Sequence, residues 1–71
     1  MKRMYNIYNN VKKFRVTLKL TQQELADLAD VSRLTIISME KQKYEPSVGL
    51  AIRLAKIFSC KVEDLFNIGD E

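Results

Sequence analysis

Apolar residues recur every three or four positions along most of the chain, and this spacing lines one face of an α-helix. Val11, Phe14 and Leu18 show it first, with basic residues between them. The predicted helices cover about residues 10–18, 22–30, 32–41, 48–58 and 62–67. The chain contains only two glycines and one proline, and its β-branched residues do not alternate with polar ones. The pattern therefore predicts an all-α fold, a compact bundle of five helices.

Capping residues mark where these helices begin. Thr21 is followed three residues later by Glu24, which is the pattern of a capping box at the start of the second helix. Ser32 and Ser47 are candidate N-caps of the third and fourth helices. The apolar stripe of the second helix consists of Leu25, Ala26, Leu28 and Ala29, and the third helix should turn Ile36 and Met39 inward. The fourth helix is predicted to have a wide apolar face, made of Val48, Ala51, Ile52, Leu54, Ala55, Ile57 and Phe58. Two short helices joined by a tight turn form a helix-turn-helix, although many helical domains contain such a pair.

The length and composition narrow the classes of function. At 71 residues and 8.3 kDa the chain allows one domain. We expect an N-terminal arm over residues 1–9, the domain over 10–67 and a frayed tail over 68–71. The chain has no histidine, and Cys60 is its one cysteine, so Cys/His zinc sites and His-dependent catalytic triads are excluded. We expect no enzyme, metal or cofactor, and we expect Cys60 to pack as a small hydrophobe.

Charged residues are segregated along the chain although the net charge is only +3. Residues 1–20 contain six bases and no acid, whereas residues 21–40 contain one base and four acids. Residues 41–61 are basic again, and the last ten residues carry four acids. Basic segments that converge in space would suit a polyanion, but charge runs are more often simply solvated.

The run from Leu20 to Glu40, LTQQELADLADVSRLTIISME, resembles the Cro/XRE family of phage-repressor-like helix-turn-helix regulators. The resemblance continues through Pro46-Ser47 to the segment Val62–Phe66, so it covers roughly residues 10–67. It implies a lambda-repressor-like DNA-binding domain of five helices, which commonly acts as a homodimer. Where the family usually has glycine, this chain has Lys19, Asp30, Gln42 and Ser59. A side chain disfavours the positive φ of such turns, so the sequence leaves their geometry open.

The third predicted helix supplies the candidate DNA contacts. Arg33 lies in its first turn, where a guanidinium can bind guanine O6 and N7, and Leu34 could contact a thymine methyl. Ser38 lies one turn further along the same face. The expected base contacts are thus Arg33, Leu34 and Ser38. The expected phosphate contacts, partly implied by the resemblance, are Gln22, Ser32, Thr35, Lys41 and Lys43, and Ser32 should act mainly as the cap.

The resemblance also implies an internal ion pair between Arg15 and Glu40. Apolar residues near the C-terminus, Leu65, Phe66 and Ile68, suggest a dimer surface, and a symmetric dimer would read a palindromic operator. The sequence leaves three roles open for Ile37: packing, contact with DNA, or contact with a partner protein. The segment Met1–Asn9, with Lys2, Arg3, Tyr5 and Tyr8, could be a DNA-backbone arm, a dimer element or disordered.

The sequence predicts a cytoplasmic regulator that binds double-stranded DNA in a sequence-specific way, with residues 32–41 in the major groove. Repression is the favoured role, and activation is the alternative that the sequence leaves open. The chain shows neither an apolar stretch long enough to span a membrane nor an evident small-molecule site. The alternative is a protein–protein interaction module, such as an antitoxin or adaptor, which the apolar Leu34 and Ile37 would suit.

Overall fold

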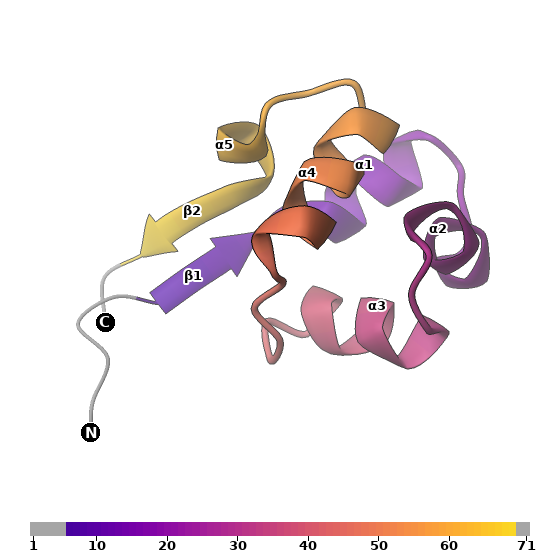
Figure 1. The fold of residues 1–71 in the computed structure, drawn as a ribbon, viewed down its shortest axis with the longest axis horizontal. Helices are drawn as coiled ribbons and strands as arrows, with labels where there is room; N and C mark the ends of the chain where they lie inside the picture. The colour runs from indigo at the N-terminus through magenta and orange to yellow at the C-terminus, as the bar shows by residue number, and fades with distance from the viewer. Residues whose placement is uncertain (1–5, 70–71) are drawn as a thin grey trace.

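The computed structural model describes residues 6–69, which form a small helical bundle with a two-stranded sheet at one side (Figure 1). In chain order the elements are β1 (Asn6–Asn9), α1 (Val11–Thr17), α2 (Gln22–Ala29), α3 (Arg33–Glu40), α4 (Val48–Ile57), α5 (Val62–Leu65) and β2 (Phe66–Gly69). The five helices of the described residues lie close to their predicted positions. No helix among these residues is long and apolar enough to cross a membrane.

The predicted caps begin the helices. The Thr21 hydroxyl accepts from the Glu24 amide at 3.0 Å, and the Glu24 carboxylate accepts from the Thr21 amide at 2.8 Å. Ser32 accepts from the amide of Thr35 and Ser47 from that of Leu50, both at 3.2 Å. Each side chain therefore satisfies a backbone N–H that the first turn of a helix leaves without a partner.

All four residues that stand in place of the family's glycines adopt the left-handed conformation. Lys19, Asp30, Gln42 and Ser59 have φ values of 59°, 58°, 62° and 53°. After each of them the chain donates a backbone hydrogen bond across the helix end, as in the bond from the Lys43 amide to the Ser38 carbonyl at 2.9 Å. This is the Schellman arrangement, which is usually closed by glycine. The turns thus keep the family's geometry with non-glycine residues.

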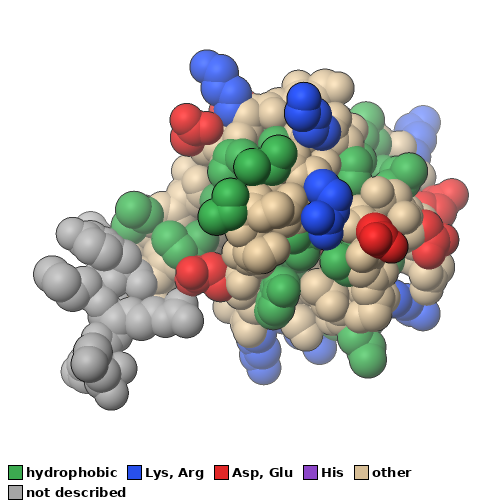
Figure 2. All heavy atoms as spheres, in the orientation of Figure 1, with side chains coloured by type: hydrophobic (Ala, Val, Ile, Leu, Met, Phe, Trp, Pro, Cys, Tyr) green, Lys and Arg blue, Asp and Glu red, His purple; other side chains and the backbone are tan. Residues whose placement is uncertain are grey.

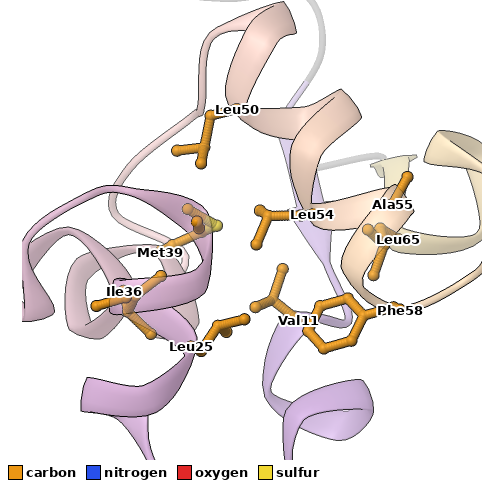
Figure 3. Packing of buried hydrophobic residues seen from close by; sticks show 11 residues of the cluster. Val11, Leu25, Ile36, Met39, Leu50, Leu54, Ala55, Phe58 and Leu65 are labelled. Carbon is orange, nitrogen blue, oxygen red and sulfur yellow. The ribbon is translucent and has the colours of Figure 1, made fainter.

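The hydrophobic core draws on all five helices of the described chain (Figure 3). Its largest fully buried side chains are Leu25, Ile36, Met39, Leu54, Leu65 and Val11. Phe14 and Phe58 pack at its edge with ring centroids 5.5 Å apart. This core holds α2 and α3 together, with Ile36 and Met39 turned inward as the sequence predicts.

The sheet corrects the all-α prediction. β1 and β2 pair antiparallel, with Asn6 opposite Gly69 and Asn9 opposite Phe66. Residues 6–9 of the predicted arm are therefore a strand, and residues 66–69, predicted as helix end and frayed tail, are its partner. The predicted fifth helix ends at Leu65, two residues early. The pairing joins the two ends of the chain, so a local hydrophobic pattern could not reveal it.

The apolar stripes predicted for α2 and α4 are narrower than expected. Leu28 is 57% exposed, while Leu25, Ala26 and Ala29 are buried. Val48 and Ile52 are likewise exposed on α4. The stripe prediction was wrong for these three residues because each helix of such a small domain contacts neighbours over only part of its apolar face.

Candidate nucleic-acid interface

α3 packs on α2 and presents its outer face to solvent. Arg33 and Leu34 are exposed, with Leu34 exposed over 73% of its surface. Ser38, one turn after Leu34 on the same face, is half-buried, and so is Ile37. The structure therefore brings the three residues expected to contact bases onto the outer side of one helix. Basic side chains project from the lower edge of the molecule in Figure 2, the side where α3 lies in Figure 1.

The first turn of α3 is fixed by two hydroxyls. The Ser32 oxygen accepts from the Thr35 amide, and it lies 3.0 Å from the Thr35 hydroxyl oxygen. Ser32 is therefore the cap of α3, as the sequence predicts. The two hydroxyls share a hydrogen bond, so a polar group of a ligand would contact both of them together.

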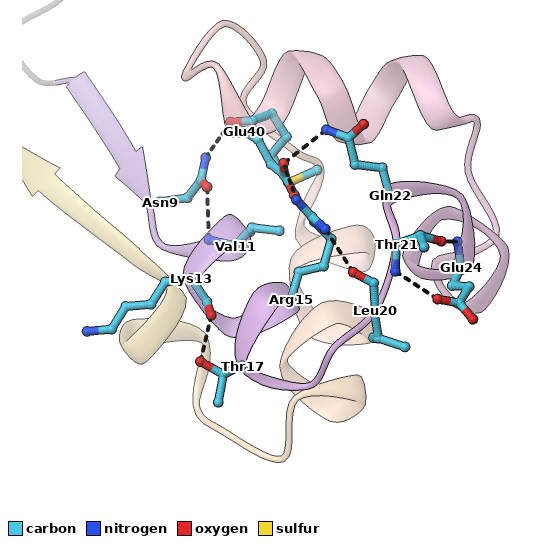
Figure 4. A network of polar contacts seen from close by, with 11 residues as sticks. Asn9, Val11, Lys13, Arg15, Thr17, Leu20, Thr21, Gln22, Glu24 and Glu40 are labelled. Carbon is cyan, nitrogen blue, oxygen red and sulfur yellow. Dashed lines mark hydrogen bonds and ion pairs between the residues drawn. The ribbon is translucent and has the colours of Figure 1, made fainter.

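Arg15, Gln22 and Glu40 form a polar network beneath this surface (Figure 4). Arg15 Nε lies 2.6 Å from Glu40 Oε2, and Arg15 Nη2 donates to Glu40 Oε1 at 3.2 Å. The side chains of Arg15 and Glu40 are only 12% and 5% exposed. Arg15 also donates to the Leu20 carbonyl at 2.8 Å. The expected ion pair is thus present and nearly buried, and it ties α1 to the end of α3.

Gln22 joins this network, which the sequence did not predict. Its Nε2 donates to Glu40 Oε1 at 3.1 Å. The amide nitrogen carries two hydrogens, so Glu40 uses only one of them. A shallow hollow beside Gln22 is lined by Arg15, Thr21, Gln22, Gln23 and Arg33. It opens at the start of α2, where backbone N–H groups and the helix dipole favour an anion.

Lys41 and Lys43 are exposed on either side of Gln42, directly after α3. The two basic residues predicted to touch the flanking backbone thus lie at the opposite end of α3 from Arg33. Gln42 itself is attached to Asn9 of β1 by side-chain hydrogen bonds. No local pattern indicates this attachment, because the two residues lie 33 positions apart.

The expected dimer surface is only partly available. Leu65 is fully buried in the core, so its assignment to that surface was wrong. Phe66 is half-buried against the core, while Ile68 is 64% exposed. The error arose because the segment after Leu65 was expected to be helical and instead continues as a strand. Lys2, Arg3 and Tyr5, on which the arm hypothesis rested, lie outside the described residues.

Cys60 is half-buried against the core, as expected of a small hydrophobe. Burial, and then the nearby charge of Asp64, raise the pKa of the Cys60 thiol. A raised pKa leaves less of the reactive thiolate at neutral pH. Packing is therefore the role that the surroundings of Cys60 favour.

A sequence model of the helix-turn-helix family matches residues 11–65. The chain belongs to this family. The helix-turn-helix proteins of this Cro/XRE type are a non-enzymatic class of DNA-binding transcriptional regulators. In their terms α3 is the recognition helix and α2 the helix that precedes it.

Curated relatives agree with this family. The chain is 48% identical over 63 residues to an uncharacterized HTH-type transcriptional regulator of Methanocaldococcus jannaschii, covering 89% of this chain and 96% of the relative. It is 38% identical over 63 residues to the uncharacterized HTH-type transcriptional regulator YgzD of Bacillus subtilis, with 89% and 96% covered. The crystal structure of the transcriptional regulator VanUg has the same fold, with a TM-score of 0.78 at 17% identity over 99% of this chain and 93% of that one.

Proposed function

We propose that this helix-turn-helix protein is a homodimeric repressor that reads a palindromic operator. One observation carries the proposal: the outer face of the recognition helix, with Arg33 and the 73% exposed Leu34, is open to solvent beside basic residues. A helix so presented fits the major groove of B-DNA. Repression follows most simply, because a bound domain blocks access to a promoter. The DNA partner implies a cytoplasmic location.

The proposed base contacts are Arg33, Leu34 and Ser38. Arg33 would donate two parallel hydrogen bonds to a guanine, and Leu34 would pack on a thymine methyl. Ser38 is half-buried, so it would reach a base directly or through one water. These three contacts would read a half-site of a few base pairs.

The proposed phosphate contacts flank the recognition helix. Gln22 would donate its second amide hydrogen to a phosphate that enters the hollow it forms with Arg15 and Arg33. Ser32 and Thr35 would contact a phosphate of the same strand, with the hydroxyl hydrogen that their mutual hydrogen bond leaves unused as the donor. Lys41 and Lys43 would contact the backbone beyond the other end of α3. Such contacts orient the helix without reading sequence.

The proposed dimer forms through the sheet rather than through α5. Ile68 lies directly opposite Ile7, and Phe66 lies two residues along on the same face. A two-stranded sheet is marginally stable alone in water, so a partner would stabilise it. A second copy would cover the exposed Ile68 and place two recognition helices about 34 Å apart.

Selection from a random duplex library tests this function. The full chain is incubated with the library at about 0.15 M salt, which suppresses purely electrostatic binding, and the bound duplexes are sequenced. We expect an inverted repeat whose half-sites are one helical turn apart. Recovery of a single half-site without symmetry would contradict the proposed dimer. Recovery of no motif by a folded protein would favour the interaction module, for which the exposed Leu34 would serve as a contact.

A further inference from the structure

Gln42 is the one residue of the four left-handed helix ends whose side chain the structure ties to another element. Its φ of 62° disfavours any residue with a Cβ. Ser59 has the same conformation at the end of α4, with φ at 53°, and makes no side-chain hydrogen bond within the described residues. Glycine would fit both positions. Gln42 thus differs from Ser59 in gaining side-chain contacts that offset its backbone strain.

The side chain of Gln42 clamps the end of β1. Its Oε1 accepts from the Asn9 backbone amide at 2.9 Å and from Asn9 Nδ2 at 3.2 Å. Its Nε2 donates to the Asn9 carbonyl at 3.1 Å. Gln42 thus binds both backbone groups of Asn9, as a neighbouring strand would. Asn9 Nδ2 donates in addition to the Met39 carbonyl in the last turn of α3, at 2.9 Å.

This clamp joins the sheet to the recognition helix by a short path. Asn9 pairs with Phe66, and the same face of the sheet carries Ile7 and the exposed Ile68. At the other end, Gln42 lies two residues after the last residue of α3. A rotation of the sheet would therefore be transmitted to the end of α3 through hydrogen bonds. The sheet lies beside that end of α3 in Figure 1.

We propose that Gln42 is a positioning residue that fixes the recognition helix relative to the sheet and so sets the operator half-site spacing. The inference rests on the proposed dimer, in which the sheet meets its copy. With the clamp, each protomer presents α3 at one angle, and the dimer fits one spacing. Without it, α3 keeps its own contacts to bases but turns more freely against the sheet.

The test compares Gln42→Gly with the matched control Ser59→Gly. Both substitutions relieve the strain of a side chain on a left-handed backbone, but only Gln42→Gly removes the hydrogen bonds to Asn9. Binding is measured by fluorescence anisotropy on duplexes with the selected half-sites at the native spacing and one or two base pairs to either side, and on a single half-site. We expect wild type and Ser59→Gly to favour the native spacing about tenfold, and Gln42→Gly to favour it less than about threefold. Single half-site affinity should not change.

Several outcomes would overturn the inference. An unchanged spacing profile in Gln42→Gly would show that the clamp does not set spacing, while the dimer proposal stands. A loss of single half-site affinity would make Gln42 a direct phosphate contact. A variant that sediments as a monomer where wild type is a dimer would make the clamp merely structural. If wild type itself sediments as a monomer without spacing preference, the dimer proposal fails first, and this inference fails with it.

A second variant guards against a folding defect in the first. Gln42→Asn tolerates the left-handed conformation but is one methylene too short to hold both backbone groups of Asn9. It should flatten the spacing profile as Gln42→Gly does. A native profile in Gln42→Asn would also overturn the inference. Circular dichroism and thermal unfolding establish that each variant is folded before binding is compared.

Discussion

At the scale of single residues, the Arg15–Glu40 pair connects the fold to the side chains proposed to bind DNA. Glu40 accepts from Arg15 and also from Gln22, so one nearly buried carboxylate organises α1, the start of α2 and the end of α3. Gln22 in turn borders the hollow proposed for a phosphate. The residue that stabilises the fold thus also orients a residue expected to hold DNA.

Removal of the Glu40 carboxylate should be costly. In Glu40→Ala the guanidinium of Arg15 loses its partner while 12% exposed, and we expect a loss of about 3 kcal/mol in the free energy of unfolding. Lys12→Ala, at an exposed position of α1, should change stability by less than about 0.5 kcal/mol. Urea denaturation followed by circular dichroism measures both. Equal stability of the two variants would show that the pair contributes little.

Arg33 carries the prediction about sequence reading. Arg33→Ala should lower the affinity for the selected operator by about 10- to 100-fold, the loss of one bidentate guanine contact. Stability should be unaffected because the side chain is exposed. Anisotropy titrations against the operator and against a duplex changed at that guanine give the comparison. An operator affinity equal to wild type would argue that α3 serves a protein partner instead.

At the scale of elements, helix ends are the distinctive feature of this chain. Four helices end in the left-handed conformation without glycine, and the backbone hydrogen bonds of the Schellman arrangement hold each turn. These backbone hydrogen bonds therefore keep the left-handed geometry although the local residue is not glycine. A side chain at each of these positions lowers the stability of the fold, and at Gln42 the contact with Asn9 offsets this loss.

Ser59→Gly should therefore stabilise the protein. Relief of the left-handed side chain is worth about 1 kcal/mol, after the greater flexibility of glycine in the unfolded chain is allowed for. Gln42→Gly gains the same relief but loses three hydrogen bonds, so it should gain less than Ser59→Gly. Thermal unfolding of the two variants side by side decides this. A gain in Gln42→Gly as large as that in Ser59→Gly would mean that the clamp adds no stability.

At the scale of the whole molecule, the sheet gives the bundle a second surface. The outer face of α3 is the surface proposed for DNA, and the exposed Ile68 lies on the sheet, the surface proposed for a second copy. The two surfaces meet at Asn9 and Gln42. A dimer built on the sheet would thus be coupled to the recognition helix within each protomer.

Ile68→Asp tests that surface. A charge on the apolar sheet face should raise the dimer dissociation constant by at least about tenfold, because the carboxylate would be desolvated in the interface. The monomer should stay folded, since Ile68 is 64% exposed. Leu28→Asp places the same charge on the exposed part of α2 and should leave the dimer intact. Sedimentation equilibrium compares the three proteins, and dissociation caused by Leu28→Asp alone would move the interface to α2.

The sequence by itself determined the helices, their starts and the family. Thr21, Ser32 and Ser47 act on backbone groups within their own turns, so a local reading was enough. The inward faces of Ile36 and Met39 followed from helical spacing. Arg15 and Glu40 came from the resemblance, because nothing local joins residues 25 positions apart.

Only the tertiary structure decided the sheet, the burial of Leu65 and the clamp at Gln42. β1 and β2 come from opposite ends of the chain, and each is four residues long, too short to leave a pattern of its own. The sequence suggested that Leu65 lies on a dimer surface, whereas in the structure Leu65 is buried in the core and the chain continues as β2. Gln42 departs from the family's glycine, and its use appears only once Asn9 is folded against it. Contacts between distant residues depend on the packing of the whole chain, which local periodicity does not encode.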